Sequence, residues 1–141
     1  RKLFLGGIEI PYHKGLLGHS DADVLIHALC DSLLGAIAEG DIGEHFPDSE
    51  PKYHGISSMK LLEQVSELIK SKGYSVCNID AVVIAQEPSL TPFKDKIKEK
   101  VSKALNIAKE SVSIKAKTNE GVGEIGHSEA ISCYVVSLLE R

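Results

Sequence analysis

No stretch of this sequence approaches the roughly 20 consecutive apolar residues that a membrane-spanning helix needs. Positive charge is not in excess either, since 16 Lys and Arg stand against 20 Asp and Glu, for a net charge of −4. This balance excludes a general basic surface of the kind that holds nucleic acid. An anionic ligand would instead need metal ions, local lysines or helix N-termini to hold it.

Cysteine is also scarce. The three cysteines, Cys30, Cys77 and Cys133, are widely spaced and form no C-x-x-C pair. Each lies in an apolar run, which predicts buried free thiols in a reducing compartment. A signal-peptide pattern is absent, so we expect a protein that is not secreted. Because residue 1 is Arg rather than Met, we also expect residues upstream of it.

The sequence has no internal repeat, linker or low-complexity segment. With 141 residues it is expected to form a single domain over 1–141 that buries a substantial core. Periodicity and turn residues predict these elements in chain order: a β-ribbon over 1–10 that turns at Gly6-Gly7, a helix from a cap at Ser20 or Asp21 to Gly40, an irregular loop over 41–55, a helix capped by Ser57 or Ser58 and ended by Gly73, a strand over 78–85, a helix capped by Thr91 with Pro92 at its first position, a strand over 112–117, a loop over 118–127 and a strand over 131–139.

This element order predicts an α/β or α+β sandwich in which helices cover mainly one face of a mixed sheet. The centre of the strand over 78–85 is continuously apolar, which suggests burial on both of its faces. The strand over 131–139 is apolar at nearly every position, and its β-branched residues favour a strand over a helix. A sheet face without helices implies a partner.

The first predicted helix carries polar side chains at four-residue intervals. Asp23, His27 and Asp31 would stack along one face of it. One ring nitrogen of His27 could bind a metal while a carboxylate holds the other nitrogen and fixes the tautomer. The alternative is a solvated polar face with ordinary i,i+4 support, and spacing alone leaves both interpretations open.

A longer pattern surrounds this helix. Residues 19–31 read H-S-D-x-D-x-x-x-H-A-x-x-D, and residues 40–48 read G-D-I-G-x-x-F-P-D. Together with Ala85-Gln86-Glu87-Pro88 and with residues 115–120, they closely resemble the 2-C-methyl-D-erythritol 2,4-cyclodiphosphate synthases of the non-mevalonate isoprenoid pathway. The resemblance covers essentially the whole chain.

The resemblance implies two metal sites. Family members bind one zinc through an Asp-x-His pair on the first strand and a histidine on the first helix, and His27 matches that histidine. The Asp-x-His pair has no counterpart here, so we expect it upstream of Arg1, in a sequence truncated at its start. Glu120 matches the ligand of a second ion, for which Mg²⁺ or Mn²⁺ bridging Glu120 and a substrate diphosphate is expected.

The resemblance also implies the substrate contacts and the catalytic residues. The expected catalytic set is Asp31, Asp48, Thr118 and Glu120. The positions expected to hold the methylerythritol phosphate are His19, Ser20, Asp41, Gly43 and Asp48, and those expected to hold the cytidine diphosphate are Ala85, Pro88, Ser89, Leu90, Thr91 and Thr118. His13, His45 and His54 are expected to be surface histidines.

The implied assembly is a chorismate-mutase-like or ferredoxin-like sandwich that forms a homotrimer around its sheet faces, with active sites at the subunit boundaries. The central cavity of some relatives holds an isoprenoid diphosphate, a weaker expectation here because His127 replaces an arginine that some relatives carry. The expected location is the bacterial cytoplasm or a plastid-type organelle, with neither a nucleic-acid partner nor a membrane.

The implied reaction cyclises 4-diphosphocytidyl-2-C-methyl-D-erythritol 2-phosphate and releases CMP, as a phosphorus–oxygen lyase. One alternative is a zinc hydrolase that uses His27, although the sequence has no H-E-x-x-H arrangement. Another is a trimeric protein that binds nucleotide or isoprenoid phosphates without catalysis.

Overall fold

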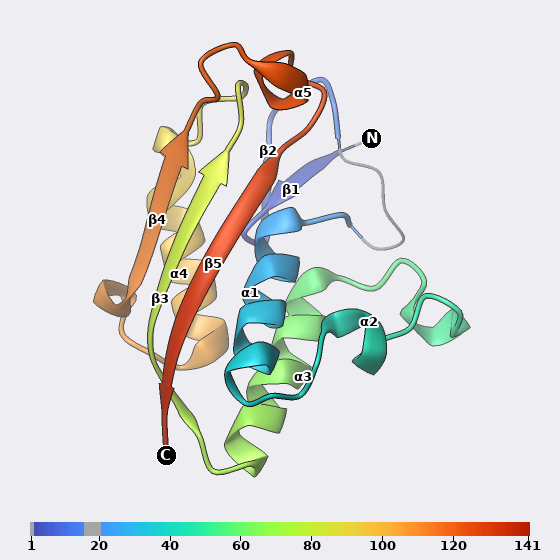
Figure 1. Cartoon of the computed structure of the whole chain (residues 1–141), viewed down its shortest axis with the longest axis vertical. Helices are drawn as coiled ribbons and strands as arrows, with labels where there is room; N and C mark the ends of the chain where they lie inside the picture. The colour runs from blue at the N-terminus through green and yellow to red at the C-terminus, as the bar shows by residue number, and fades with distance from the viewer. Residues whose placement is uncertain (1, 16–20) are drawn as a thin grey trace.

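A mixed sheet and a layer of helices make up this computed structural model, which describes residues 2–15 and 21–141 (Figure 1). The helices and strands are β1 (Leu3–Leu5), β2 (Ile8–Ile10), α1 (Val24–Ala36), α2 (Ile42–His45), α3 (Ser58–Ser71), β3 (Ser75–Ile84), α4 (Lys94–Leu105), β4 (Val112–Lys117), α5 (Gly123–Gly126) and β5 (Ser132–Glu140), with short 3-10 turns η1 (Pro51–Tyr53), η2 (Thr91–Phe93) and η3 (Lys109–Ser111).

The main sheet has the strand order β4-β3-β5. β3 runs parallel to β4 and antiparallel to β5, so that Ala81 lies opposite Ile114 on one side and Val135 on the other. β1 and β2 form a separate antiparallel hairpin whose turn, Gly6-Gly7, has positive φ at both residues. A mixed sheet and an N-terminal ribbon were both predicted from the sequence, and both are confirmed.

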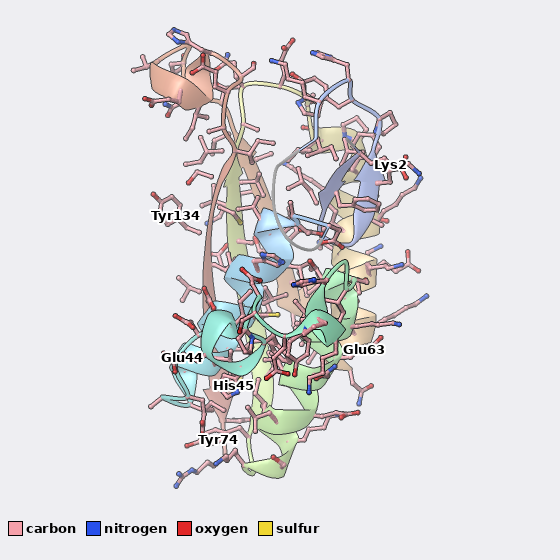
Figure 2. All side chains as sticks on the ribbon, turned by 90° about the vertical axis from the view of Figure 1, so that its right-hand side faces the viewer. Lys2, Glu44, His45, Glu63, Tyr74 and Tyr134 are labelled. Atoms are coloured by element: carbon pink, nitrogen blue, oxygen red, sulfur yellow. The ribbon has the colours of Figure 1, made fainter. Side chains whose placement is uncertain are left out.

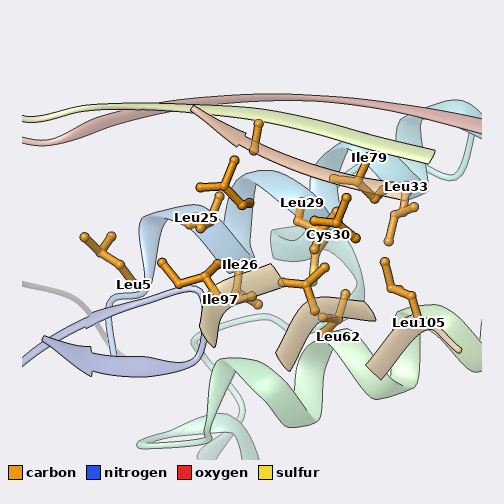
Figure 3. Packing of buried hydrophobic residues seen from close by; sticks show 14 of the residues in the cluster. Leu5, Leu25, Ile26, Leu29, Cys30, Leu33, Leu62, Ile79, Ile97 and Leu105 are labelled. Atoms are coloured by element: carbon orange, nitrogen blue, oxygen red, sulfur yellow. The ribbon is translucent and has the colours of Figure 1, made fainter. Parts of the chain in front are cut away.

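The helices cover one face of this sheet and bury the core against it (Figures 1 and 3). Leu25, Leu29 and Leu33 line one stripe of α1, and each is at most 1% exposed. α3 and α4 contribute stripes of their own, which include Leu62 and Ile97. The predicted fold class is therefore confirmed. In the part of the chain described here, no helix is both long enough and apolar enough to span a membrane.

The opposite face of the sheet carries large apolar side chains that this chain leaves exposed. Tyr134, Val136 and Leu138 of β5 are 64%, 70% and 60% exposed. Figure 2 shows Tyr134 projecting from the sheet on the side away from the helices. β3 buries Ile79, Ala81 and Val83 on its inner face, while the alternate residues are less buried. Within one chain, the prediction that both faces of this strand are buried is thus wrong.

The ends of α1 differ from the prediction. The cap is Asp23 rather than Ser20 or Asp21, because the Asp23 carboxylate accepts from the backbone N–H of Ile26 at 3.0 Å. Ser20 lies outside the described residues. The helix ends at Ala36 rather than near Gly40, because Ile37 caps it and Ala38 supplies the left-handed residue, with a φ of 57°.

Two further expectations need correction. The segment over 41–55 is not irregular throughout, since it contains the helical turn α2 and the 3-10 turn η1. Thr91 does not cap α4: Thr91 and Pro92 form η2, and α4 begins after Phe93 without a side-chain cap. The cap at Ser57 and the strand over 112–117 are confirmed. All three cysteines are free, but only Cys30 is buried, while Cys77 and Cys133 are half-buried.

We expect Asp23→Ala to lower the free energy of unfolding by about 3 kcal/mol. The loss combines a helix cap, worth about 1 kcal/mol, with the buried amide of Gly6 and the part-buried amide of Gly7, each left without its acceptor at about 1 kcal/mol. Urea unfolding measures the change. Asp95→Ala is the matched control, because Asp95 is exposed and ion-paired with Lys109, so a loss within about 1 kcal/mol is expected. Equal losses in the two variants would contradict the role of Asp23.

Candidate functional site

The N-terminal end of α1 is attached to the β1–β2 turn through Asp23. The side chain is fully buried and accepts from the N–H groups of Gly6, Gly7 and Ile26 at 3.0, 2.7 and 3.0 Å. Burial raises the pKa of this carboxyl group, although the three backbone hydrogen bonds oppose the shift. Asp23 is therefore a structural clamp that points toward the hairpin.

His27 lies one turn further along α1, and its ring contacts Ser58 of α3. Its Nε2 lies 3.0 Å from the Ser58 hydroxyl, and that hydroxyl donates to Asp21 Oδ1. The Ser58 N–H donates to the other oxygen of Asp21 at 3.0 Å. Of the two interpretations that spacing left open, the structure shows Asp23 and Asp31 accepting from the backbone N–H groups of Ile26 and Ile42. Ser58 links the His27 imidazole to Asp21.

Asp31 positions the next element. Its carboxylate accepts from the N–H of Ile42 at 2.9 Å, at the first residue of α2. Asp41 caps the same helical turn and accepts from the Glu44 N–H at 2.9 Å. Gly43 is exposed beside it, and an added Cβ there would lie 3.4 Å from Asp41 Oδ1. The G-D-I-G motif thus forms an exposed one-turn helix anchored to α1.

Two histidines brace α2 and the loop that follows it. His45 Nε2 lies 2.7 Å from the carbonyl oxygen of Glu39, and His54 Nε2 lies 2.7 Å from that of Asp48. Phe46 and Tyr53 pack edge to face within the same loop, with ring centroids 5.4 Å apart. Of the three expected surface histidines, His13 and His54 are exposed, whereas His45 is half-buried. The Asp48 side chain is exposed on this braced loop.

A cavity of about 370 Å³ opens where the parallel strands β3 and β4 end. Its volume falls in the range of small-molecule sites. The lining includes all six residues expected at the cytidine diphosphate: Ala85, Pro88, Ser89, Leu90, Thr91 and Thr118. Leu90 is buried and fixes the segment to the core, and the Ala85 N–H donates to the Lys117 carbonyl at 2.9 Å.

The loop after β4 is held by Gln86. The Gln86 Oε1 accepts from the N–H groups of Asn119 and Gly121, at 3.3 and 3.1 Å. Between them, Glu120 is exposed and has a φ of 53°, in the left-handed region that side-chain-bearing residues rarely adopt. Its own N–H donates to Thr118 Oγ1 at 3.3 Å. Thr118 and Glu120, predicted together, are thus in contact, and Thr118 lines the cavity.

The two groups of candidate residues do not meet within one chain. Figure 1 places α2 on one side of α1, and the ends of β3 and β4 on the other. His19 and Ser20 lie outside the described residues. Over the part of the chain that is described, no cluster of three or more His, Cys, Asp or Glu side chains could hold a metal ion. The His27 imidazole fits zinc as a single ligand, and the metal assignments stay predictions.

Sequence reasoning missed the roles of Asp21, Ser58 and Gln86. Ser58 was considered only as a helix cap, and its contact with residues 37 positions away has no periodic signal. Gln86 was quoted within a family motif, but its side chain was given no role. The only sequence signal for Asp21 and Gln86 is that each is a polar residue inside a motif that matches the family.

The fold and the cavity define a small α/β protein with a ligand site at the carboxyl ends of two parallel strands. The YgbB family model matches residues 1–140, and this chain belongs to that family. A curated relative from Desulforamulus reducens, named 2-C-methyl-D-erythritol 2,4-cyclodiphosphate synthase, is 57% identical over all of this chain and 90% of its own length.

Solved structures agree with this assignment. IspF from Plasmodium falciparum in a CDP complex is 38% identical, with a TM-score of 0.86 over 98% of this chain and 83% of that chain. The bifunctional IspDF from Campylobacter jejuni is also 38% identical, with a TM-score of 0.94 over 99% of this chain. The match spans only 38% of the Campylobacter chain.

Proposed function

We propose that this chain cyclises 4-diphosphocytidyl-2-C-methyl-D-erythritol 2-phosphate to 2-C-methyl-D-erythritol 2,4-cyclodiphosphate, as a phosphorus–oxygen lyase. An oxygen of the 2-phosphate bonds to the β-phosphorus of the same molecule, the bond from that phosphorus to the CMP oxygen breaks, and CMP leaves. The observation that carries the proposal is the cavity at the ends of β3 and β4, which Thr118 lines and whose lining residue Gln86 holds the loop that carries Glu120. The names of the relatives support this function over a non-catalytic binding protein.

The residues of this chain contribute positioning rather than a nucleophile. The segment over 85–91 would hold the cytidine largely through its backbone groups, and the Thr118 hydroxyl would donate to a diphosphate oxygen. Asp41 and Asp48, both exposed near α2, would accept hydrogen bonds from the sugar hydroxyls. Holding the attacking and leaving oxygens in line removes much of the entropic barrier.

His27 would bind zinc and Glu120 would bind Mg²⁺ or Mn²⁺, with the remaining zinc ligands contributed from outside the described residues. When bound, such ions neutralise the charge that builds up on the phosphate oxygens during transfer. Glu120 is suited to a hard cation because it is exposed and its backbone is fixed on both sides by Gln86.

We further propose a homotrimer whose active sites lie at the subunit boundaries. The exposed apolar residues of β5 support a sheet-to-sheet interface, since monomers rarely leave such a patch open. The separation of α2 from the β3–β4 cavity supports sites assembled from two subunits, with α2 of one subunit completing the cavity of its neighbour.

Turnover assays test the function directly. The protein is incubated with the substrate and divalent metal, and CMP and the cyclic product are quantified. Calorimetry with CDP then measures binding at the cavity. We expect cyclic product together with CDP binding. CDP binding without product would favour the non-catalytic binding protein, and an open-chain phosphate product would favour the hydrolase.

We expect Gln86→Met to raise the Mn²⁺ concentration for half-maximal activity about thirtyfold. Each lost hydrogen bond to the loop is worth about 1 kcal/mol, and the loop that carries Glu120 would lose two. Zinc content should not change. Metal titrations of turnover, with metal analysis of the purified protein, measure both effects.

Gln64→Met on α3 is the matched control for this variant, because Gln64 is an exposed glutamine on the helical side. It should leave the Mn²⁺ requirement unchanged. The same Mn²⁺ requirement in Gln86→Met and wild type would mean that Gln86 does not position Glu120.

A further inference from the structure

We propose that Asp21 and Ser58 are positioning residues that fix the His27 imidazole as the Nε2–H tautomer, so that Nδ1 is the atom that binds metal. The inference rests on the proposed function in one respect, namely that His27 is a zinc ligand. It adds two residues and a ring orientation that motif matching did not assign.

The geometry begins at Ser58, the first residue of α3. Ser58 is only 1% exposed, and both of its donors are directed at one carboxylate. Its N–H donates to Asp21 Oδ2 at 3.0 Å, and its hydroxyl donates to Asp21 Oδ1. The Asp23 N–H also donates to Asp21 Oδ1, at 3.2 Å, which ties the carboxylate to the chain just before α1. Asp21 is therefore held from two directions.

The protons follow from this arrangement. The Ser58 hydroxyl donates to Asp21 Oδ1, and a hydroxyl has a single proton, so that proton is committed to Asp21. The Ser58 oxygen must then accept in its contact with His27 Nε2, 3.0 Å away. A neutral imidazole has one N–H, so a proton on Nε2 leaves Nδ1 unprotonated, which is the form of a ring nitrogen that coordinates metal.

Capping of α3 accounts for the bond from the Ser58 N–H, an otherwise unpaired amide of the first turn, but not for the contacts of the Ser58 hydroxyl. α3 already has a side-chain cap, because the Ser57 hydroxyl accepts from the Met59 N–H at 3.2 Å. The Ser58 hydroxyl instead links the segment before α1, the ring on α1 and the start of α3. Groups that orient a metal-binding histidine in this way commonly change metal affinity 10- to 100-fold when they are removed.

The first test uses the unmodified protein without metal. Nitrogen-15 NMR at a pH of about 8.5, above the ordinary range of histidine, identifies the tautomer of the His27 ring. We expect the Nε2–H form. The Nδ1–H form would overturn the proposal, and this result does not depend on whether any variant folds.

The second test compares variants by chelator competition for zinc. Ser58→Ala should weaken zinc binding by about 10- to 100-fold and allow the His27 ring to populate both tautomers. Asp21→Asn should have a similar effect, because its amide nitrogen is a donor and would face one of the two Ser58 donors. Ser102→Ala is the matched control, since Ser102 is also buried and its hydroxyl donates to the Glu99 carbonyl on α4.

The outcomes separate the inference from the proposed function. If His27→Ala retains zinc, the metal assignment of the proposed function fails. If His27→Ala loses zinc while Ser58→Ala keeps wild-type affinity and a single tautomer, only the positioning role is overturned. A loss of affinity in Ser102→Ala equal to that in Ser58→Ala would show a general effect of stability and would also overturn it.

Discussion

His27→Ala is expected to abolish zinc binding and to lower turnover by about a thousandfold while the fold persists. The activity loss reflects charge stabilisation worth several kcal/mol that a metal supplies to a transferring phosphoryl group. The fold should persist because the buried stripe of α1, which includes Leu25 and Leu29, does not involve His27 (Figure 3). Metal analysis measures the zinc content, turnover assays measure the activity, and urea unfolding measures whether the fold persists.

The energetic cost to the fold should be about 1 kcal/mol, since one hydrogen bond to Ser58 is lost and Ser58 keeps Asp21 as its acceptor. His13→Ala is the matched control, because His13 is an exposed histidine in the segment after β2. Full zinc content and full turnover in His27→Ala would contradict the assignment. A collapse of the fold would contradict the claim that the apolar stripe is sufficient.

Elements with a strong apolar period could be predicted from the sequence. The amphipathic stripe of α3 and its cap at Ser57 were sufficient to place that helix, and the strand over 112–117 was predicted with its exact bounds. α2 was missed because a single helical turn is too short to show a period, and only Asp41 marks its start. The cap of α1 was misplaced because three candidate residues, Ser20, Asp21 and Asp23, lie close together in the sequence.

The candidate site was predictable as a list of residues but not as a geometry. Thr118 and Glu120 are near neighbours in sequence, so a loop that joins them is expected. The contact from Asp21 to Ser58 spans 37 residues, and those from Gln86 to the loop span 33 and 35. Such contacts depend on how α1, α3 and β3 pack. Local patterns in a single sequence do not contain that information.

Val136→Lys is expected to dissociate the proposed trimer and to remove most of the activity with it. Val136 is 70% exposed in the single chain, and it lies on the sheet face that would meet the neighbouring subunits. A lysine there would have to be buried without a matched partner across the interface, at a cost of several kcal/mol per ion. About 4 kcal/mol corresponds to a thousandfold weaker association.

The substitution is chosen so that the single chain tolerates it. Val136 pairs with Asp80 across the β3–β5 register, and Asp80 is already ion-paired with Lys115 on the same face, at 3.0 Å. A lysine at 136 would therefore add a favourable neighbour to Asp80 in the monomer. Urea unfolding monitored by circular dichroism should show that the variant remains folded.

Sedimentation equilibrium at micromolar concentration measures the assembly, and turnover at the same concentration measures its consequence. Gln64→Lys adds the same charge to the exposed side of α3 and should remain trimeric and active. A stable monomer in the wild-type protein would rule out the assembly altogether. Full activity in a monomeric Val136→Lys would instead mean that one chain holds a complete site, contrary to the separation of α2 from the β3–β4 cavity.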